Sequence, residues 1–146
     1  MKIVIDSNIL FSALLKADAK LAELILNPSF SIQGFACYFL YIELFKHKEK
    51  IVRLSSLAEA DLLDVLYRLI RKMTFINETV IPDEIRLEAY HLTADIDPKD
   101  APFVALSIYA DAPLWTGDRK LVDGLRAKGF MNVLSTADLL ARLKLS

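Results

Sequence analysis

Short apolar segments alternate with longer amphipathic segments along this chain, and the alternation restricts the folds that it can adopt. Short apolar runs predict strands at residues 2–5, 30–37, 114–115 and 133–134. Residues 75–81 fit either a further strand or an extended link. Strands that alternate with helices form βαβ units, whose parallel sheet is covered by helices on both faces. The sequence therefore predicts an α/β fold with three layers, α/β/α, and a mainly parallel central sheet.

Apolar residues at helical spacing mark the intervening segments. Helices are predicted at residues 9–14, 21–26, 38–50, 56–73, 85–92, 101–110, 119–128 and 137–143. Ser56 and Glu59 have the spacing of a capping box, and Ser135 or Thr136 is expected to cap the last helix. Residues 95–102, rich in Asp and Pro, are predicted to form a loop. Because no linker or repeat interrupts the chain, we expect residues 1–146 to form a single domain.

Composition narrows the class of protein further. The chain of 146 residues is 54% apolar, which is enough for a well-packed core. Its apolar runs are too short to span a bilayer, and it shows no secretory leader pattern. The single cysteine, Cys37, excludes an internal disulfide and is expected to be a small core residue. A cytoplasmic protein is therefore expected.

Acidic residues occur in four separated segments, at positions where a carboxylate is difficult to explain as filler. Asp6 and Asp118 each follow a predicted strand, Asp100 opens a predicted helix, and Glu43 lies within an apolar helical segment. In open α/β sheets, ligands bind beyond the carboxyl ends of the strands, so these side chains can converge there. Converging carboxylates repel one another unless a cation lies between them. Mg²⁺ prefers oxygen ligands and acts with substrate phosphates, so the pattern points to phosphate chemistry.

Each acid also has a simpler interpretation. Asp100 fits the N-cap of a helix, Asp118 fits a turn or an N-cap, and Glu43 fits a partly exposed helix position. Asp6 is harder to explain in this way, because an unpaired carboxylate at the end of a buried strand costs several kcal/mol. The four together favour a site more strongly than any one of them does.

Four short segments that contain these acids resemble the motifs of the PIN domain family, in the same order. They are residues 3–10, 41–45, 100–106 and 116–118, so the resemblance spans nearly the whole chain. It implies a PIN-like fold and an endoribonuclease that depends on Mg²⁺ or Mn²⁺. Its metal and its attacking water would be held by Asp6, Glu43, Asp100 and Asp118. Asn8 and Thr116 resemble the polar residues that support such a site, although local capping and turn formation explain them equally well.

The resemblance also has implications for partners and mechanism. It implies a homodimer and an RNA substrate, and in the VapC-type toxin members of the family an antitoxin protein fills the groove. Water would attack the phosphodiester in line while a carboxylate orients or deprotonates it, with no side-chain nucleophile.

In one respect the chain departs from the family. Many relatives carry a further acid shortly after the position of Asp118, whereas this chain continues with Arg119 and Lys120. Asp123 lies one helical turn too late to replace it, which puts a second tightly held metal in doubt. Asp97, three residues before Asp100, is a reserve candidate.

The net charge of −1 means that any nucleic acid must be bound by local basic patches. Two clusters, residues 46–53 and 68–72, are such patches or are solvated helix faces. The candidate phosphate contacts are Lys46, Lys50, Lys99, Arg119 and Lys120. His47, one turn after Glu43, is expected to be exposed, although the spacing also allows it to face the site. With one cysteine and two histidines, zinc is not expected.

Two other functions remain open. A phosphoryl-transfer enzyme would use Asp6 as a covalent nucleophile, because such enzymes also place an aspartate after the first strand. A PIN-like scaffold would bind RNA or a protein without cleaving it. The scaffold would be indifferent to Mg²⁺ and to EDTA, which separates it from a nuclease.

Overall fold

In a computed structural model, which describes residues 1–15 and 20–145, five strands form one parallel sheet in the order β3-β2-β1-β4-β5. The strands are β1 (Lys2–Ile5), β2 (Gln33–Cys37), β3 (Met73–Ile76), β4 (Leu114–Trp115) and β5 (Val133–Leu134). The α-helices are α1 (Ser7–Leu15), α2 (Lys20–Leu26), α3 (Phe39–Lys46), α4 (Lys48–Leu54), α5 (Glu59–Lys72), α6 (Asp83–Thr93), α7 (Ala101–Ala110), α8 (Arg119–Ala127) and α9 (Thr136–Leu145). Short 3₁₀ helices occupy η1 (Pro28–Phe30), η2 (Glu78–Val80) and η3 (Pro98–Asp100). The α/β prediction is confirmed.

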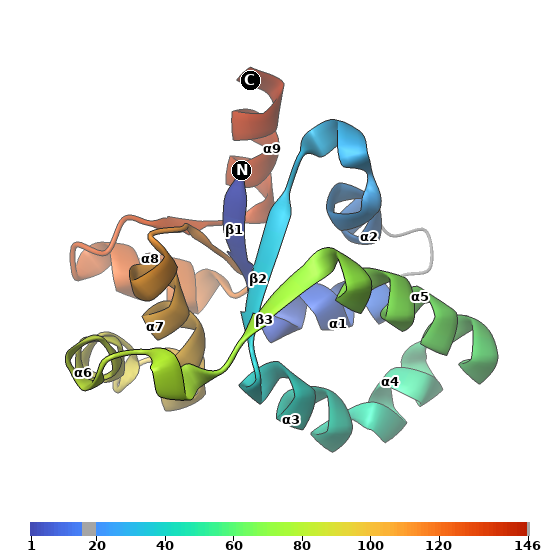
Figure 1. Cartoon of the computed structure of the whole chain (residues 1–146), viewed down its shortest axis with the longest axis horizontal. Helices are drawn as coiled ribbons and strands as arrows, with labels where there is room; N and C mark the ends of the chain where they lie inside the picture. The colour runs from blue at the N-terminus through green and yellow to red at the C-terminus, as the bar shows by residue number, and fades with distance from the viewer. Residues whose placement is uncertain (16–19, 146) are drawn as a thin grey trace.

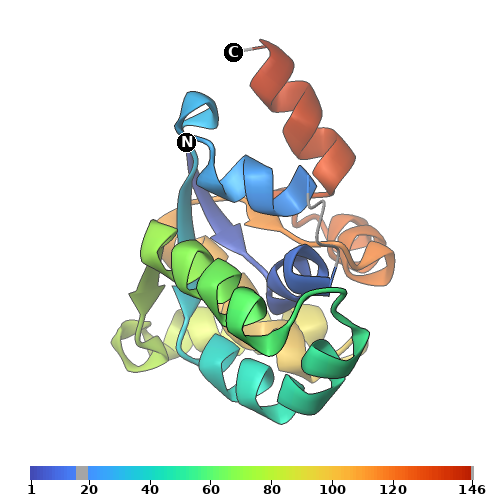
Figure 2. The same ribbon diagram turned by 90° about the vertical axis from the view of Figure 1, so that its right-hand side faces the viewer.

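The helices lie on both faces of the sheet. Figure 1 shows α1, α2 and α5 on one side and α6, α7 and α8 on the other. Both termini lie at the same end of the molecule, and α3 and α4 lie at the opposite end (Figures 1 and 2). Among the described residues, no helix combines the length and the apolar character needed to cross a membrane.

The central strand β1 explains why the sheet needs two covering layers. Ile3, Val4 and Ile5 are all fully buried, so both faces of this strand contact the core. A parallel strand with such a continuous apolar run is stable only between helices. Helix α7 covers one face, and its residues Phe103 to Ser107 are also buried. Because the strands are parallel, their C-terminal ends lie at the same edge of the sheet, and polar residues follow them there.

Three predicted elements differ from the observed ones. The helix predicted over residues 38–50 is divided at His47, whose backbone leaves the helical region, and the second part, α4, continues to Leu54. The link predicted at 75–81 contains a strand, β3, but this strand starts earlier, at Met73, and pairs with β2.

The predicted capping box at Ser56 and Glu59 is wrong. Helix α5 begins at Glu59 itself, after Ala58, which makes no side-chain cap. The preceding serine is used instead, because Ser55 Oγ accepts a hydrogen bond from the Leu57 amide at 3.2 Å. That turn leads into Leu57, which packs against the core. By contrast, Ser135 caps α9 as expected, since its Oγ accepts from the Asp138 amide at 3.1 Å.

Candidate active site

The register of β1 and β4 places Asp6 beside Thr116. Ile5 pairs with Trp115, and the Asp6 amide donates to the Trp115 carbonyl at 3.0 Å, so the next residues of both strands are neighbours. The Thr116 hydroxyl donates to Asp6 Oδ2 at 2.7 Å. Both residues are buried. The pairing of β1 with β4 thus brings together two residues that are 110 positions apart in the sequence.

Asn8 links the first turn of α1 to the loop after β4. Its Nδ2 donates to Asp6 Oδ2 and to Thr116 Oγ1, both at 3.1 Å. Its Oδ1 accepts from the Gly117 amide at 3.0 Å. Asn8 and Thr116 therefore support the Asp6 carboxylate and also shape the adjacent turn, so the two interpretations of these residues are compatible.

Asp118 begins helix α8. Its Oδ1 accepts from the Leu121 amide at 3.3 Å, and its own amide donates to Thr116 Oγ1 at 3.1 Å. The N-cap interpretation of Asp118 is therefore correct. The cap also fixes the position of the carboxylate close to the Asp6 side of the sheet edge.

Asp100 differs from Asp118, although it too precedes a helix. It stands at the N-cap position of α7 but makes no side-chain cap there. Asp97 provides the nearby cap instead, since its Oδ1 accepts from the Lys99 amide at 3.0 Å. Among residues 1–15 and 20–145, Asp100 Oδ2 is the buried side-chain oxygen or nitrogen without a hydrogen-bond partner. Because a buried carboxylate oxygen is rarely left unpaired, this atom calls for a ligand.

Glu43 lies on α3, half-buried, with His47 one turn later. The Glu43 Oε2 to His47 Nε2 distance is 3.7 Å, and the His47 ring packs edge-on against Phe11. His47 is thus partly buried rather than an exposed helix histidine. Its orientation is set by the break between α3 and α4.

The electrostatics show that these acids are close together. Burial, followed by the charges of Asp6, Asp97, Asp118 and Glu43, raises the pKa of Asp100 to about 7. Burial also raises the pKa of Asp6 to about 6; the hydrogen bond from Thr116 opposes this rise, and the charges of Glu43 and Asp118 add to it. Four predicted acids and the reserve candidate Asp97 therefore lie within electrostatic reach of one another.

A divalent cation fits part of this arrangement. Within the described residues, no three His, Cys, Asp or Glu side chains are gathered closely enough to form a complete metal site. Mg²⁺, however, is commonly held by one or two carboxylates, with waters and substrate phosphates completing its octahedron. Asp6 and Asp100 suit that role. Asp6 is buried and Asp100 is half-buried, both are repelled by other acids, and Asp100 has an unpaired oxygen. Both provide carboxylate oxygens, the donors that suit Mg²⁺ and Mn²⁺.

The candidate phosphate contacts are all on the surface. Lys46, Lys50, Lys99, Arg119 and Lys120 are exposed. Arg119 and Lys120 directly follow Asp118, and Lys99 directly precedes Asp100, so these three adjoin site residues in sequence.

Glu78 is a supporting residue that the sequence analysis did not identify. Its carboxylate accepts from the amides of Tyr38 at 2.6 Å and Phe39 at 3.2 Å. It therefore anchors the start of α3, the helix that carries Glu43. A contact across 40 residues has no local signal in the sequence, whereas the pairing of β2 with β3 brings the two segments together.

Together, the parallel α/β/α sheet and the carboxylates at its C-terminal edge define a class of protein with an oxygen-lined, acidic site. The chain belongs to the PIN domain family, which its sequence matches over residues 4–138.

Solved structures share this fold. The chain is similar to one in the crystal structure of VapBC2 from Rickettsia felis bound to a DNA fragment from their promoter, with a TM-score of 0.65, 14% identity, and coverage of 92% of this chain and 97% of that one. It is also similar to the crystal structure of PAE2754 from Pyrobaculum aerophilum, with a TM-score of 0.67, 17% identity, and coverage of 100% and 97%. No curated protein sequence matches the chain.

Proposed function

We propose that this chain is a metal-dependent endoribonuclease that hydrolyses RNA phosphodiester bonds with Mg²⁺ or Mn²⁺. The main support is the pair Asp6, which is buried, and Asp100, which is half-buried; the pKa values of these carboxyl groups are raised to about 6 and about 7. Membership of the PIN family supports the proposal, because PIN domains generally are nucleases. A cation between these groups would remove their repulsion and explain why the fold keeps them.

The four acids have different roles in this proposal. Asp6 and Asp100 would hold the cation directly, and Glu43 and Asp118 would reach it through water. When bound, the cation supplies charge that stabilises the phosphate in the transition state and makes water a better nucleophile. Asn8 and Thr116 hold Asp6 Oδ2, so the carboxylate keeps one orientation. A carboxylate at this edge takes the proton from the attacking water.

The hydrogen bonds of Asp6 make a covalent phosphoryl-transfer mechanism less suitable. Asp6 is buried, and its Oδ2 already accepts from Thr116 and Asn8. Its Oδ1, with Ser7 Oγ at 3.5 Å, is the oxygen that remains for a cation, and a cation held there would block attack on phosphorus by the same atom. Hydrolysis by water needs no bond between Asp6 and phosphorus.

For partners, we propose a homodimer and an antitoxin protein, in a single-domain protein of the cytoplasm. The solved VapBC2 structure supports an antitoxin by similarity of fold. Exposed apolar side chains on and beside α3 also support a protein partner: Tyr38, Tyr41, Ile42 and Phe45.

Cleavage of a long RNA transcript tests the proposal. The wild-type chain is incubated with the RNA in Mn²⁺, in Mg²⁺ and in EDTA, beside the variants Asp100→Asn and Asp83→Asn. Asp83 is an exposed aspartate on α6, so its variant is the matched control. We expect cleavage with either metal, none with EDTA, a loss of about 100-fold or more in Asp100→Asn, and no change in Asp83→Asn. RNA binding with no cleavage under any condition would instead identify a scaffold.

A further inference from the structure

A cavity of about 480 Å³ adjoins the acidic site, between the start of α8 and the start of α9. We call it the α8–α9 pocket. Its lining includes Thr116 and Gly117, which belong to the turn that holds Asp6, together with Arg119, Asp123, Arg126, Ser135 and Asp138. A strand of nucleic acid that has one phosphate at the acids therefore has space for its next nucleotide here.

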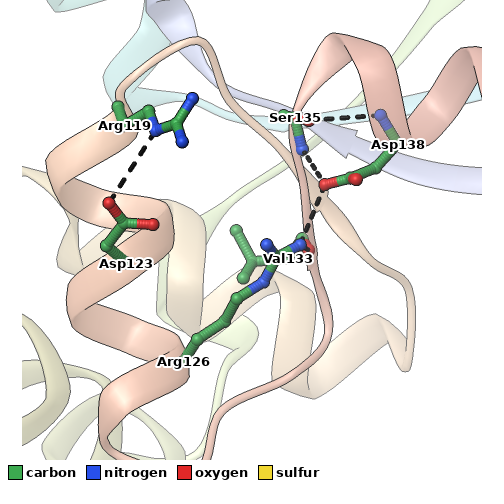
Figure 3. A network of polar contacts seen from close by, with 6 residues as sticks. All are labelled: Arg119, Asp123, Arg126, Val133, Ser135 and Asp138. Atoms are coloured by element: carbon green, nitrogen blue, oxygen red, sulfur yellow. Dashed lines mark hydrogen bonds and ion pairs between the residues drawn. The ribbon is translucent and has the colours of Figure 1, made fainter.

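On one side of the pocket, an arginine and an aspartate neutralise each other's charge. Arg126 Nη2 donates to Asp138 Oδ2 at 2.8 Å and to the Val133 carbonyl at 3.1 Å, and Asp138 also accepts from the Ser135 amide at 3.0 Å (Figure 3). The Ser135 amide and then Arg126 lower the pKa of Asp138 to about 2. Arg126 and Asp138 are bound to each other and to the backbone, so we do not expect either charge to bind a ligand.

The other side of the pocket carries Arg119, whose charge is available to bind a ligand. The Arg119 side chain is 93% exposed, and its Nε lies 3.9 Å from Asp123 Oδ2, whose side chain is 67% exposed (Figure 3). An exposed ion pair at that distance contributes little. The terminal nitrogens of Arg119 remain outside this contact, and a guanidinium presents them as a fork that matches a phosphate.

The second cavity beside the acids differs in its lining. It measures about 340 Å³ and is lined by Ala101, Pro102 and Ala105, which follow Asp100, together with Ile81, Glu78 and Arg86. Each cavity has as many basic as acidic side chains, but four of these six residues are apolar. An apolar lining suits a base better than a phosphate. The sugar–phosphate backbone is therefore expected on the side of Arg119.

We propose that the α8–α9 pocket is a backbone subsite for RNA, in which Arg119 binds the phosphate next to the scissile one. In this arrangement, Asp123 is a counter-charge that weakens the contact. The inference rests on the proposed function, because it places the scissile phosphate at the acids. It assigns a role to Arg119, the first of the two basic residues that follow Asp118.

The test measures binding of a labelled, short, single-stranded RNA of mixed sequence by fluorescence anisotropy at several salt concentrations. All variants carry Asp100→Asn, so that the RNA stays intact, and the buffer contains EDTA, because this variant is expected to lose the cation. Arg119→Ala is compared with Asp123→Asn, which removes the counter-charge and retains the arginine. The controls are Arg142→Ala on α9 and Asp61→Asn on α5, two exposed residues outside both basic clusters.

We expect Arg119→Ala to weaken binding about tenfold and to lower the salt slope by about 0.7, the value for one phosphate of a single strand. We expect Asp123→Asn to strengthen binding about two- to fivefold, since it removes a repulsive charge near the phosphate. A structural role of the pair would not produce opposite effects. The two control variants, Arg142→Ala and Asp61→Asn, should match the parent.

Unchanged binding in Arg119→Ala, or equal losses in Arg119→Ala and Arg142→Ala, would overturn the subsite. Cleavage of the long transcript by the otherwise wild-type chain separates this failure from that of the proposed function. Cleavage with no effect of Arg119→Ala on binding overturns the subsite alone. Absence of both cleavage and RNA binding overturns the proposed function and the subsite with it.

Discussion

The hydroxyl group of Thr116 joins three other residues of the site at a single atom. It donates to Asp6 Oδ2 at 2.7 Å, and it accepts from Asn8 Nδ2 and from the Asp118 amide, each at 3.1 Å. Thr116 is fully buried. Removal of the hydroxyl therefore leaves polar groups of these three neighbours with fewer hydrogen-bond partners.

Thr116→Val keeps the shape of the side chain and removes these bonds. We expect the free energy of unfolding to fall by about 1–3 kcal/mol, because buried groups lose their partners. We also expect the pKa of Asp6 to rise above about 6, since the hydrogen bond from Thr116 is what lowers it. Urea denaturation and an NMR titration of the Asp6 carboxyl measure the two effects.

Thr116→Ser is the control, because it keeps the hydroxyl and loses only a methyl group. It should retain the pKa of Asp6 while losing part of the packing. Equal pKa values of Asp6 in the Val and Ser variants would show that the hydroxyl does not orient the carboxylate.

At the residue scale, the sequence shows where the candidate acids lie but not which groups they contact. A carboxylate directly after a buried apolar run, as at Asp6, is visible in one line of sequence. The partners of that carboxylate depend on the register of β1 against β4, which no local pattern specifies. The unpaired oxygen of Asp100 was equally invisible, because Asp97 and Asp100 both fit the N-cap pattern and only the structure shows that Asp97 forms the cap.

Helix α3 shows how an element depends on a distant anchor. Its N-cap residue, Tyr38, provides no side-chain cap, and its first amides are bound by the Glu78 carboxylate. A negative charge at a helix N-terminus is stabilising. The position of Glu43 at the site therefore depends in part on a residue between β3 and α6.

Glu78→Gln retains one acceptor oxygen and removes the charge and the second acceptor. We expect about 1 kcal/mol lower stability, the usual scale for a lost cap, and faster hydrogen exchange at the amides of Tyr38 and Phe39. Hydrogen-exchange NMR measures the local effect. Glu88→Gln, on the exposed face of α6, serves as the control. If both variants exchange these amides at the wild-type rate, Glu78 is not the anchor.

Most elements were predictable because their periodicity is strong. The fully buried β1 and the apolar α7 have patterns that few other structures share. The errors fall where tertiary contacts determine the end or start of a helix. The helix predicted over residues 38–50 is divided at His47, and α5 starts after the turn at Ser55 rather than at the predicted capping box. Strand β3 was ambiguous since it begins directly after α5, with no turn residue between them.

For the whole molecule, the acidic site makes stability depend on pH. The Asp100 carboxyl has a pKa of about 7 in the folded chain and 3.8 as an ordinary side chain. Below about pH 4 the group is protonated in both states and makes no difference. As the pH rises to about 7, the unfolded chain releases this proton while the folded chain retains it, so the metal-free protein loses stability.

The variant Asp100→Asn has no titratable group at this position, so it should not show this loss of stability as the pH rises. We expect the variant to be more stable than the wild type at pH 8 in EDTA, by roughly 1–2 kcal/mol once solvent screening of a partly exposed group is included. At about pH 3, where the group is protonated in both states, the difference should disappear. Chemical denaturation at both pH values provides the measurement. A difference that is the same at both pH values would show that the effect is not caused by the charge of Asp100.

The central claim is that Asp6 and Asp100 together form a binding site for a divalent cation. Calorimetric titration with Mn²⁺ tests it most directly, because it needs no substrate. The wild-type chain is compared with Asp6→Asn, Asp100→Asn and the exposed control Asp83→Asn, with folding checked by circular dichroism. We expect binding to the wild type and to Asp83→Asn, and its loss in both site variants while they remain folded. No binding to the wild type, or equal binding by all four proteins, would contradict the claim.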